Sequence, residues 1–71
     1  MSDIKNKAYG IVKTFDSFKG YGFITREKGK DVFFFYGEIT HEDKYLTPGD
    51  KVSFELRMMD KGPRAFAIQK V

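Results

Sequence analysis

The sequence predicts an all-β protein, either a small barrel or a sandwich of antiparallel strands. Short segments rich in β-branched and aromatic residues recur at regular spacing, turn sequences with glycine, proline or aspartate separate them, and no stretch has helical periodicity of useful length. These features are typical of a fold made of short strands joined by tight turns. Five such segments within 71 residues favour a closed barrel.

The first two predicted strands are KAYGIVKTF (residues 7–15) and GYGFIT (residues 20–25). Side chains alternate between the two faces of a strand, so Tyr21 and Phe23 share one face. The other face carries Gly20, Gly22 and Ile24. Glycine inside a strand is used where the backbone bends or is approached closely. We therefore expect a bent strand that displays its two rings.

The third predicted strand is DVFFFY (residues 31–36), which follows the glycine-containing turn REKGK. Val32 and Phe34 share one of its faces. Phe33 and Phe35 share the other. The β-branched Val32 marks its own face as the likelier interior, so Phe33 and Phe35 are expected outside.

The last two strands follow a longer polar segment, which ends at the turn TPGD and is expected to contain one helical turn around residues 39–43. The fourth strand, KVSFELRM (residues 51–58), alternates cleanly. Its inward set is expected to be Val52, Phe54, Leu56 and Met58, and its outward set Lys51, Ser53, Glu55 and Arg57. After the turn DKGP, the last strand is expected to turn Phe66 and Ile68 inward, and Ala65, Ala67 and Gln69 outward.

Strand parity divides the aromatic side chains into an interior set and a surface set. The surface set is Tyr21, Phe23, Phe33 and Phe35, which lie on two neighbouring strands. The opposite assignment would make these four rings the core. It would send Ile24, Val32 and Phe34 into water and leave two glycines where cross-strand contacts are normally strongest. We therefore expect four rings on one outer face.

The composition limits the class of protein. A chain of 71 residues is expected to form one domain, residues 1–71, with a modest core. It has no cysteine, which excludes disulfides and thiolate chemistry and indicates a reducing compartment. No apolar run approaches the roughly 20 residues of a membrane span, and the charged start is unlike a signal peptide. We expect a cytoplasmic monomer without a membrane partner.

Charge and aromatic content together indicate a nucleic-acid partner. The formal net charge is +3, and 17% of the residues are aromatic, more than so small a core holds. Cations on the same strands or their turns flank the outward rings: Lys13, Lys19, Lys28, Lys30 and Arg64. Bases stack on rings while phosphates meet lysine and arginine, so this combination suits single-stranded nucleic acid. The net charge alone fits ordinary solubilising charge equally well, so the rings carry the prediction.

No catalytic site, metal site, cofactor or small-molecule substrate is predicted. The only histidine, His41, lies in the polar segment beside Glu42 and Asp43, where no nucleophile and base are paired. This cluster lacks the ligand number and spacing of a zinc site. The glycines of KGYGFI do not form a phosphate-binding loop because no helix begins after them.

Two motifs together resemble the bacterial cold shock proteins over nearly the whole chain. GIVK with Phe15, followed by KGYGFI, is similar to the opening strand and first ribonucleoprotein motif of that family. DVF with Tyr36 is similar to the second motif, and VSF and the Gly-Pro pair follow in the family's order and spacing. The resemblance implies a five-stranded antiparallel OB-type barrel that binds short stretches of single-stranded RNA or DNA as an RNA chaperone.

The resemblance also implies a set of binding residues. Positions that match the family's binding positions or their neighbours are Lys13, Lys19, Tyr21, Phe23, Asp31, Phe33, Tyr36, Lys61 and Gly62. Phe35, Phe15 and Phe18 complete the predicted site. The family usually has tryptophan at Thr14 and histidine at Phe35, so one stacking surface and one titrating group are missing here. Phe15 and Phe18 are expected to compensate for Thr14.

The alternative function is a protein-interaction or self-association module that uses the same exposed rings. The missing tryptophan and histidine favour this alternative. The flanking lysines disfavour it, because interface cores are depleted in lysine whereas nucleic-acid surfaces use it. The sequence leaves the choice between RNA and DNA open.

Overall fold

Strands and tight turns make up most of the computed structural model, which describes residues 7–40 and 44–71. The described residues form five strands and one short 3₁₀ helix: β1 (Lys7–Asp16), β2 (Tyr21–Thr25), β3 (Val32–Phe35), η1 (Tyr36–Glu38), β4 (Lys51–Met59) and β5 (Gly62–Lys70). The predicted strands are therefore confirmed in number and order.

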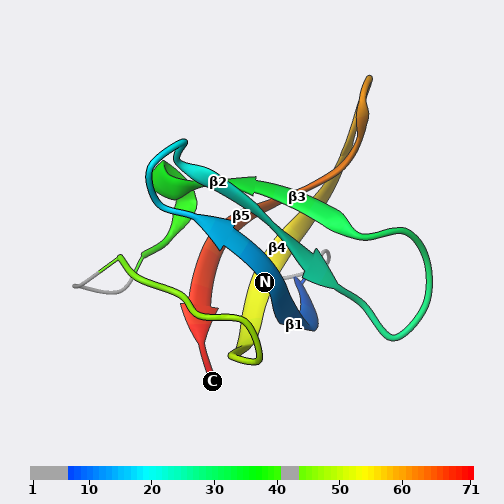
Figure 1. Cartoon of the computed structure of the whole chain (residues 1–71). Coiled ribbons are helices and arrows are strands. Elements are labelled where there is room, and N and C mark those ends of the chain that lie inside the picture. The colour runs from blue at the N-terminus through cyan, green and yellow to red at the C-terminus, as the bar shows by residue number, and fades with distance from the viewer. Residues whose placement is uncertain (1–6, 41–43) are drawn as a thin grey trace.

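The strands close into a barrel in the order β1-β2-β3-β5-β4 (Figure 1). Neighbouring strands run antiparallel except for β3 and β5, which run parallel with Phe33 opposite Arg64. Strand directions cannot alternate around a closed ring with an odd number of members, so one parallel neighbour is unavoidable. The predicted five-stranded barrel is confirmed, and its antiparallel pairing is interrupted at this β3–β5 seam.

The interior is filled from every strand of the barrel. The buried apolar side chains of the described residues are Val12, Ile24, Val32, Phe34, Ile39, Leu46, Val52, Phe54, Ala65 and Ile68. Ile24, Val32 and Phe34 have no exposed surface. The predicted assignment of faces in β2 and β3 is therefore confirmed.

Gly22 is needed where β2 pairs with β1 and the core ring of Phe34 lies close to the wall. A Cβ atom at this position would lie 2.8 Å from Cζ of Phe34 and 2.9 Å from Cα of Phe15, and it would also overlap the backbone oxygen of Thr14. These separations are shorter than van der Waals contact allows. The predicted close approach at the glycines of β2 is thus present at Gly22.

The outer half of β4 departs from the predicted alternation. Val52 and Phe54 are buried as expected, but Leu56 is only half-buried and Met58 is 71% exposed. The β4–β5 hairpin continues beyond the barrel wall (Figure 1). The inner face of its tip therefore has no core to contact, and the inward assignment of Met58 is wrong.

Ser53 is buried, although the alternation of β4 predicts it outside. It lies between two strands, opposite Tyr9 of β1 and Gln69 of β5, and is 3% exposed. Its hydroxyl is not among the buried side-chain polar atoms of the described residues that lack a hydrogen-bond partner, so its burial leaves no unpaired polar group. In β4, alternation therefore predicts correctly that Val52 and Phe54 are buried, but it does not predict that Ser53 between them is buried as well.

A β-bulge interrupts the alternation of β5. Ser53 of β4 pairs with Gln69, whereas Glu55 pairs with Phe66, so two steps along β4 match three along β5. Ala67 accommodates the extra residue with a φ of 53°, in the left-handed region. Residues on the two sides of the bulge therefore follow different parities.

Because of the bulge, the residues in the first half of β5 face the opposite way from the prediction. Ala65 is fully buried, Ile68 is buried as expected, and Phe66 lies half-buried on the outer side. The inward assignment of Phe66 and the outward assignment of Ala65 are therefore wrong. The bulge is held in place by Glu38, whose Oε1 accepts a hydrogen bond from the N–H of Ala67 at 3.2 Å.

The helical turn of the long connection lies earlier than predicted. η1 covers Tyr36–Glu38, and within the predicted range 39–43 the described residues Ile39 and Thr40 are not helical. Ile39 is buried and forms a parallel bridge to Ile68. Residues 41–43 lie outside the described residues. Within the described residues, no helix is long and apolar enough to cross a membrane.

Candidate nucleic-acid interface

Four aromatic side chains lie side by side on the outer face of β2 and β3. We refer to Tyr21, Phe23, Phe33 and Phe35 as the ring platform. In the register of these strands, Tyr21 lies opposite Phe35 and Phe23 lies opposite Phe33. Phe23 is 36% and Phe35 41% exposed, and the other two are half-buried. The predicted outer set of rings therefore presents aromatic surface to solvent.

Phe33 is the centre of the ring platform. Its ring centroid lies 4.8 Å from that of Phe35, 5.5 Å from that of Tyr21 and 5.6 Å from that of Phe23. The contacts with Phe35 and Phe23 are edge-to-face, at interplanar angles of 85° and 66°. Such geometry is favourable between aromatic rings. The rings therefore hold one another in place and form a surface that exists before any ligand arrives.

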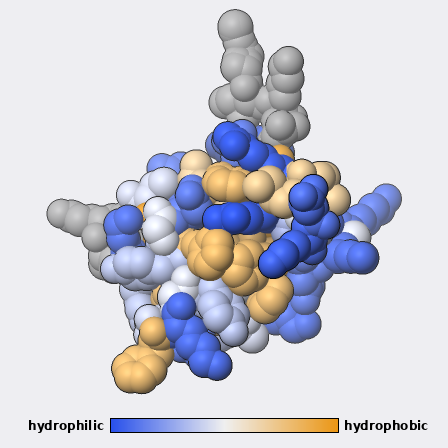
Figure 2. All heavy atoms as spheres, turned by 90° about the horizontal axis from the view of Figure 1, so that it is seen from above, coloured by the Kyte–Doolittle hydropathy of each residue, from blue (hydrophilic) through white to orange (hydrophobic). Residues whose placement is uncertain are grey.

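Charged side chains lie among the apolar ones on this side of the barrel. Figure 2 shows hydrophobic side chains at the centre of the face seen from above, with hydrophilic side chains around and between them. Lys13 Nζ of β1 lies 2.9 Å from Oδ2 of Asp31, which immediately precedes β3. Both groups are exposed, so their ion pair contributes little stability. In this structure it places the Lys13 ammonium group beside the start of β3.

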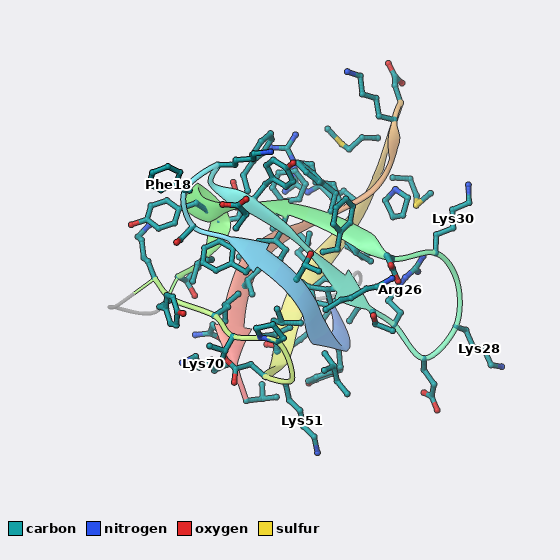
Figure 3. All side chains as sticks on the ribbon, in the orientation of Figure 1. Phe18, Arg26, Lys28, Lys30, Lys51 and Lys70 are labelled. Atoms are coloured by element: carbon teal, nitrogen blue, oxygen red, sulfur yellow. The ribbon has the colours of Figure 1, made fainter. Side chains whose placement is uncertain are left out.

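The turn between β1 and β2 carries Phe18 and Lys19. Asp16 Oδ1 accepts hydrogen bonds from the backbone N–H groups of both residues, each at 3.0 Å, which shapes the turn. Phe18 is fully exposed and projects away from the barrel (Figure 3). The structure therefore places Phe18 apart from the ring platform, and its predicted compensation for Thr14 has no contact to support it.

Tyr36 extends the aromatic surface at the end of β3. Its N–H donates a hydrogen bond to the carbonyl oxygen of Gly20 at 2.8 Å, which ties η1 to the β1–β2 turn. Tyr36 is 45% exposed, and Lys44 Nζ lies 5.7 Å from its ring centroid. Because Tyr36 directly follows Phe35, it lies next to the Tyr21 end of the ring platform.

Phe15 lies elsewhere. It is opposite Gly22 in the β1–β2 register, and its ring is stacked on Phe34 at 5.7 Å between centroids. The ring of Tyr45 lies 6.2 Å away. Phe15 is half-buried against the core. The structure therefore gives this predicted binding residue a place beside the core and does not bring it together with the ring platform.

Lys61 and Gly62 lie at the β4–β5 turn, in a groove that reaches the ring platform. The groove has a volume of about 550 Å³ and is lined by Phe33, Phe35, the two methionines that end β4, and residues 60–64. Two of the predicted neighbours of the site thus share a concave surface with two platform rings. Alternation in β4 predicts Met58 inward, so sequence reasoning missed the methionines of this groove.

Two arginines near the ring platform have aromatic partners that the sequence did not predict. The Cζ atom of Arg64 lies 4.4 Å from the ring centroid of Phe35 and 5.0 Å from that of Phe66. The Cζ atom of Arg57 lies 4.6 Å from the centroid of Phe66. The predicted inward position of Phe66 conceals this cluster, because it removes the ring from the face on which the arginines lie.

The described residues offer no site for metal chemistry. No group of three or more histidine, cysteine, aspartate or glutamate side chains among them is arranged to hold a metal ion. The weak candidate of the sequence, residues 41–43, lies outside the described residues. The functional features of the described structure are therefore the rings, the cations and the groove.

Comparison with known sequences identifies relatives over most of the chain. The sequence model of the 'Cold-shock' DNA-binding domain matches residues 8–71. The chain is 48% identical over 64 residues to the retron Se72 cold shock-like protein of Salmonella heidelberg, covering 87% of this chain and 96% of that protein. It is 48% identical over 63 residues to a cold shock-like protein of Thermotoga maritima, with coverages of 87% and 96%. It is 43% identical over 65 residues to the major cold shock protein of Streptococcus pyogenes, with coverages of 90% and 97%.

Comparison with solved structures agrees on the fold. Drosophila Unr CSD456 matches with a TM-score of 0.78 at 20% identity, over 92% of this chain and 26% of that one. This chain therefore corresponds to about a quarter of that structure, and the likeness shows the barrel alone. The family model and the sequence relatives show the family as well as the fold. The chain belongs to the cold shock domain family of nucleic-acid-binding proteins.

Proposed function

We propose that this chain binds single-stranded RNA or DNA in the cytoplasm, as a nucleic-acid chaperone that needs no cofactor. The observation that supports the proposal is the ring platform, four contiguous rings on the outer face of a barrel whose core is filled by other side chains. A contiguous exposed apolar surface rimmed by charge is typical of a binding site. Stacking on such rings is sequence-tolerant because every base has a π-face.

The proposed selectivity for single strands follows from the geometry of stacking. In a duplex each base face is covered by its neighbours, so only unpaired bases can lie on the ring platform. Binding to the unpaired form alone shifts the equilibrium toward it, by about 2.7 kcal/mol when the free protein is at 100 times its dissociation constant. That is enough to melt weak secondary structure, which is the proposed chaperone activity.

The departures from the family pattern fall at opposite edges of the ring platform. Thr14 is exposed on β1 and lies opposite Phe23, so the aromatic surface ends there. Phe35 keeps a ring but cannot donate or titrate a proton, and the guanidinium of Arg64 lies over it. We infer weaker binding at the Thr14 edge and an apolar contact at Phe35.

The proposal is tested by titrating the protein with short oligothymidine and oligouridine at several salt concentrations. Tyrosine fluorescence or calorimetry reports binding, since the chain has no tryptophan. The logarithm of the affinity should fall linearly with the logarithm of salt concentration, with a slope of about −0.7 for each phosphate neutralised. A duplex of the same sequence is the control and should bind far more weakly.

Failure to bind either oligonucleotide at low salt would contradict the proposal. Sedimentation analysis of the same sample then distinguishes the protein-interaction alternative, which predicts self-association through the exposed rings. A monomer that binds single strands supports the proposal in both respects.

A further inference from the structure

Arg57, Arg64 and Phe66 form a cluster on the outer face of β4 and β5. The Cζ atoms of both arginines lie within 5.0 Å of the centroid of Phe66, and Arg57 and Arg64 are opposite each other in the β4–β5 register. Two guanidinium groups are thus held near one ring, where cation–π attraction offsets part of their mutual repulsion. We refer to these three residues as the arginine cluster.

The arginine cluster is continuous with the ring platform. Arg64 lies opposite Phe33 across the β3–β5 seam, and its guanidinium also lies over Phe35. Successive contacts therefore lead from the rings of β2 and β3, through Arg64, to Phe66 and Arg57. This band crosses four strands of the barrel wall and borders the groove that Phe33, Phe35 and Arg64 line.

The two arginines differ in how their charge is compensated. Arg57 Nε donates a hydrogen bond to Oε2 of Glu55 at 3.0 Å, an exposed ion pair. For Arg64, no ion pair is found within the described residues, and its buried Nε has no hydrogen-bond partner there. The Arg64 guanidinium is therefore positioned by aromatic contacts while its positive charge is left for another partner.

We propose that Arg64 and Arg57 form a phosphate subsite that continues the path of a bound single strand from the ring platform onto β5 and β4. This inference rests on the proposed function and names the residues that would extend it. A guanidinium group presents a planar fork of donors that matches phosphate geometry. Phe66 acts as the support that orients the forks. Both guanidinium groups lie near its ring, so it is less open to a base than Phe23 or Phe35.

The test is the salt dependence of oligothymidine binding by Arg64→Gln, Arg57→Gln and the double variant. Each lost phosphate contact should make the slope of log affinity against log salt shallower by about 0.7. The double variant should therefore be shallower by about 1.4. The matched control is Lys51→Gln, which removes one positive charge from a side chain that points away from β2 and β3 (Figure 3). Its slope should remain that of the wild type.

A second measurement uses oligothymidines of increasing length, over the range of about four to sixteen nucleotides that a single barrel of this type occupies. Affinity should stop increasing at a shorter length in the double variant than in the wild type. Arg64→Lys keeps the charge, so its slope should match the wild type even if its affinity at a fixed salt concentration is lower. Thermal unfolding confirms that each variant is folded before binding is compared.

The outcomes separate the inference from the proposed function. If the wild type binds but both arginine variants keep its slope and its length dependence, the arginine cluster is not a phosphate subsite, although the proposed function stands. If Lys51→Gln lowers the slope as much as Arg64→Gln, the effect is one of net charge and the inference is overturned. If the wild type does not bind at all, the proposed function itself fails.

Discussion

Among single residues, the face of the strand separates rings that stabilise the barrel from rings available to a ligand. Phe54 is 2% exposed in the core, whereas Phe23 is 36% exposed at the edge of the ring platform. The two side chains have the same apolar surface to offer. Phe54 has nearly all of that surface withdrawn from water in the free protein, whereas Phe23 leaves about a third of it open to a ligand. Truncation should therefore act mainly on stability at Phe54 and mainly on binding at Phe23.

Substitution of these two residues by alanine should separate binding from stability. Phe23→Ala should weaken oligothymidine binding by about 1 to 3 kcal/mol, the contribution of one stacked base, with a small change in the free energy of unfolding. Phe54→Ala should lower the free energy of unfolding by about 3 to 5 kcal/mol because it leaves a cavity. Urea denaturation and oligonucleotide titration measure the two effects. The reverse pattern would mean that the functional face is misassigned.

The residues of the ring platform could be predicted from the sequence because one β-branched neighbour fixes the parity of a strand. Val32 places Phe34 inside, so Phe33 and Phe35 are outside. The contact between Arg64 and Phe35 could not be predicted, since it depends on which strand lies across the β3–β5 seam. Local patterns contain no information on that neighbour.

Within the elements, two glycines differ in the space around them: one lies where two strands are in close contact, and the other lies in a helix with open space beside it. Gly22 of β2 faces the backbone of β1 and the ring of Phe34, with no room for a Cβ atom. Gly37 of η1 has no atom within 4 Å of the position its Cβ would take. Only Gly22 is therefore required by its surroundings, and substitution of each glycine by alanine should reveal the difference.

Gly22→Ala should destabilise the barrel by about 3 kcal/mol or more, because backbone atoms that cannot move aside would clash with the new methyl group. Gly37→Ala should be neutral or should stabilise by about 0.4 to 1 kcal/mol, since alanine restricts the unfolded chain and meets no obstacle. Thermal or urea unfolding of the two variants side by side makes the comparison. A large loss of stability in Gly37→Ala would contradict the observed open space.

The elements that escaped prediction share a physical cause. The bulge at Ala67 adds one residue to β5, and a sequence of small alanines on either side of Phe66 gives no parity signal by which to detect it. The β4–β5 hairpin extends beyond the core, so its alternating pattern lacks an interior to which Met58 could point. Periodicity predicts an element well only where the element has one buried face along its whole length.

The molecule as a whole carries a single histidine, His41, which belongs neither to the ring platform nor to the arginine cluster. Imidazole is the ordinary side chain that titrates near neutral pH, with a pKa of about 6.5 when unperturbed. The affinity for oligothymidine should therefore be nearly constant between about pH 5.5 and 7.5. Titrations at constant ionic strength measure this. A steep change centred at about pH 6.5 would indicate that the histidine takes part in binding.

The barrel as a whole was predictable from turn spacing and strand composition, and the family resemblance gave its type. Its parallel seam was implied by the strand count alone, because an odd ring cannot alternate throughout. Where that seam falls was not implied. It depends on the path of the long connection after β3, which brings Ile39 alongside Ile68 and so sets β5 beside β3.

The position of the seam makes the closure of the barrel and the shape of the ligand surface depend on the same two residues. Phe33 and Arg64 face each other across the one pair of parallel neighbouring strands, and they also lie in the middle of the surface offered to a ligand. A substitution of either residue therefore affects both the pairing of β3 with β5 and the contacts offered to a ligand. A substitution at the margin of the surface, at Thr14 or at the tip of the hairpin, can therefore change a ligand contact and leave this closure intact, whereas a substitution at Phe33 or Arg64 changes both.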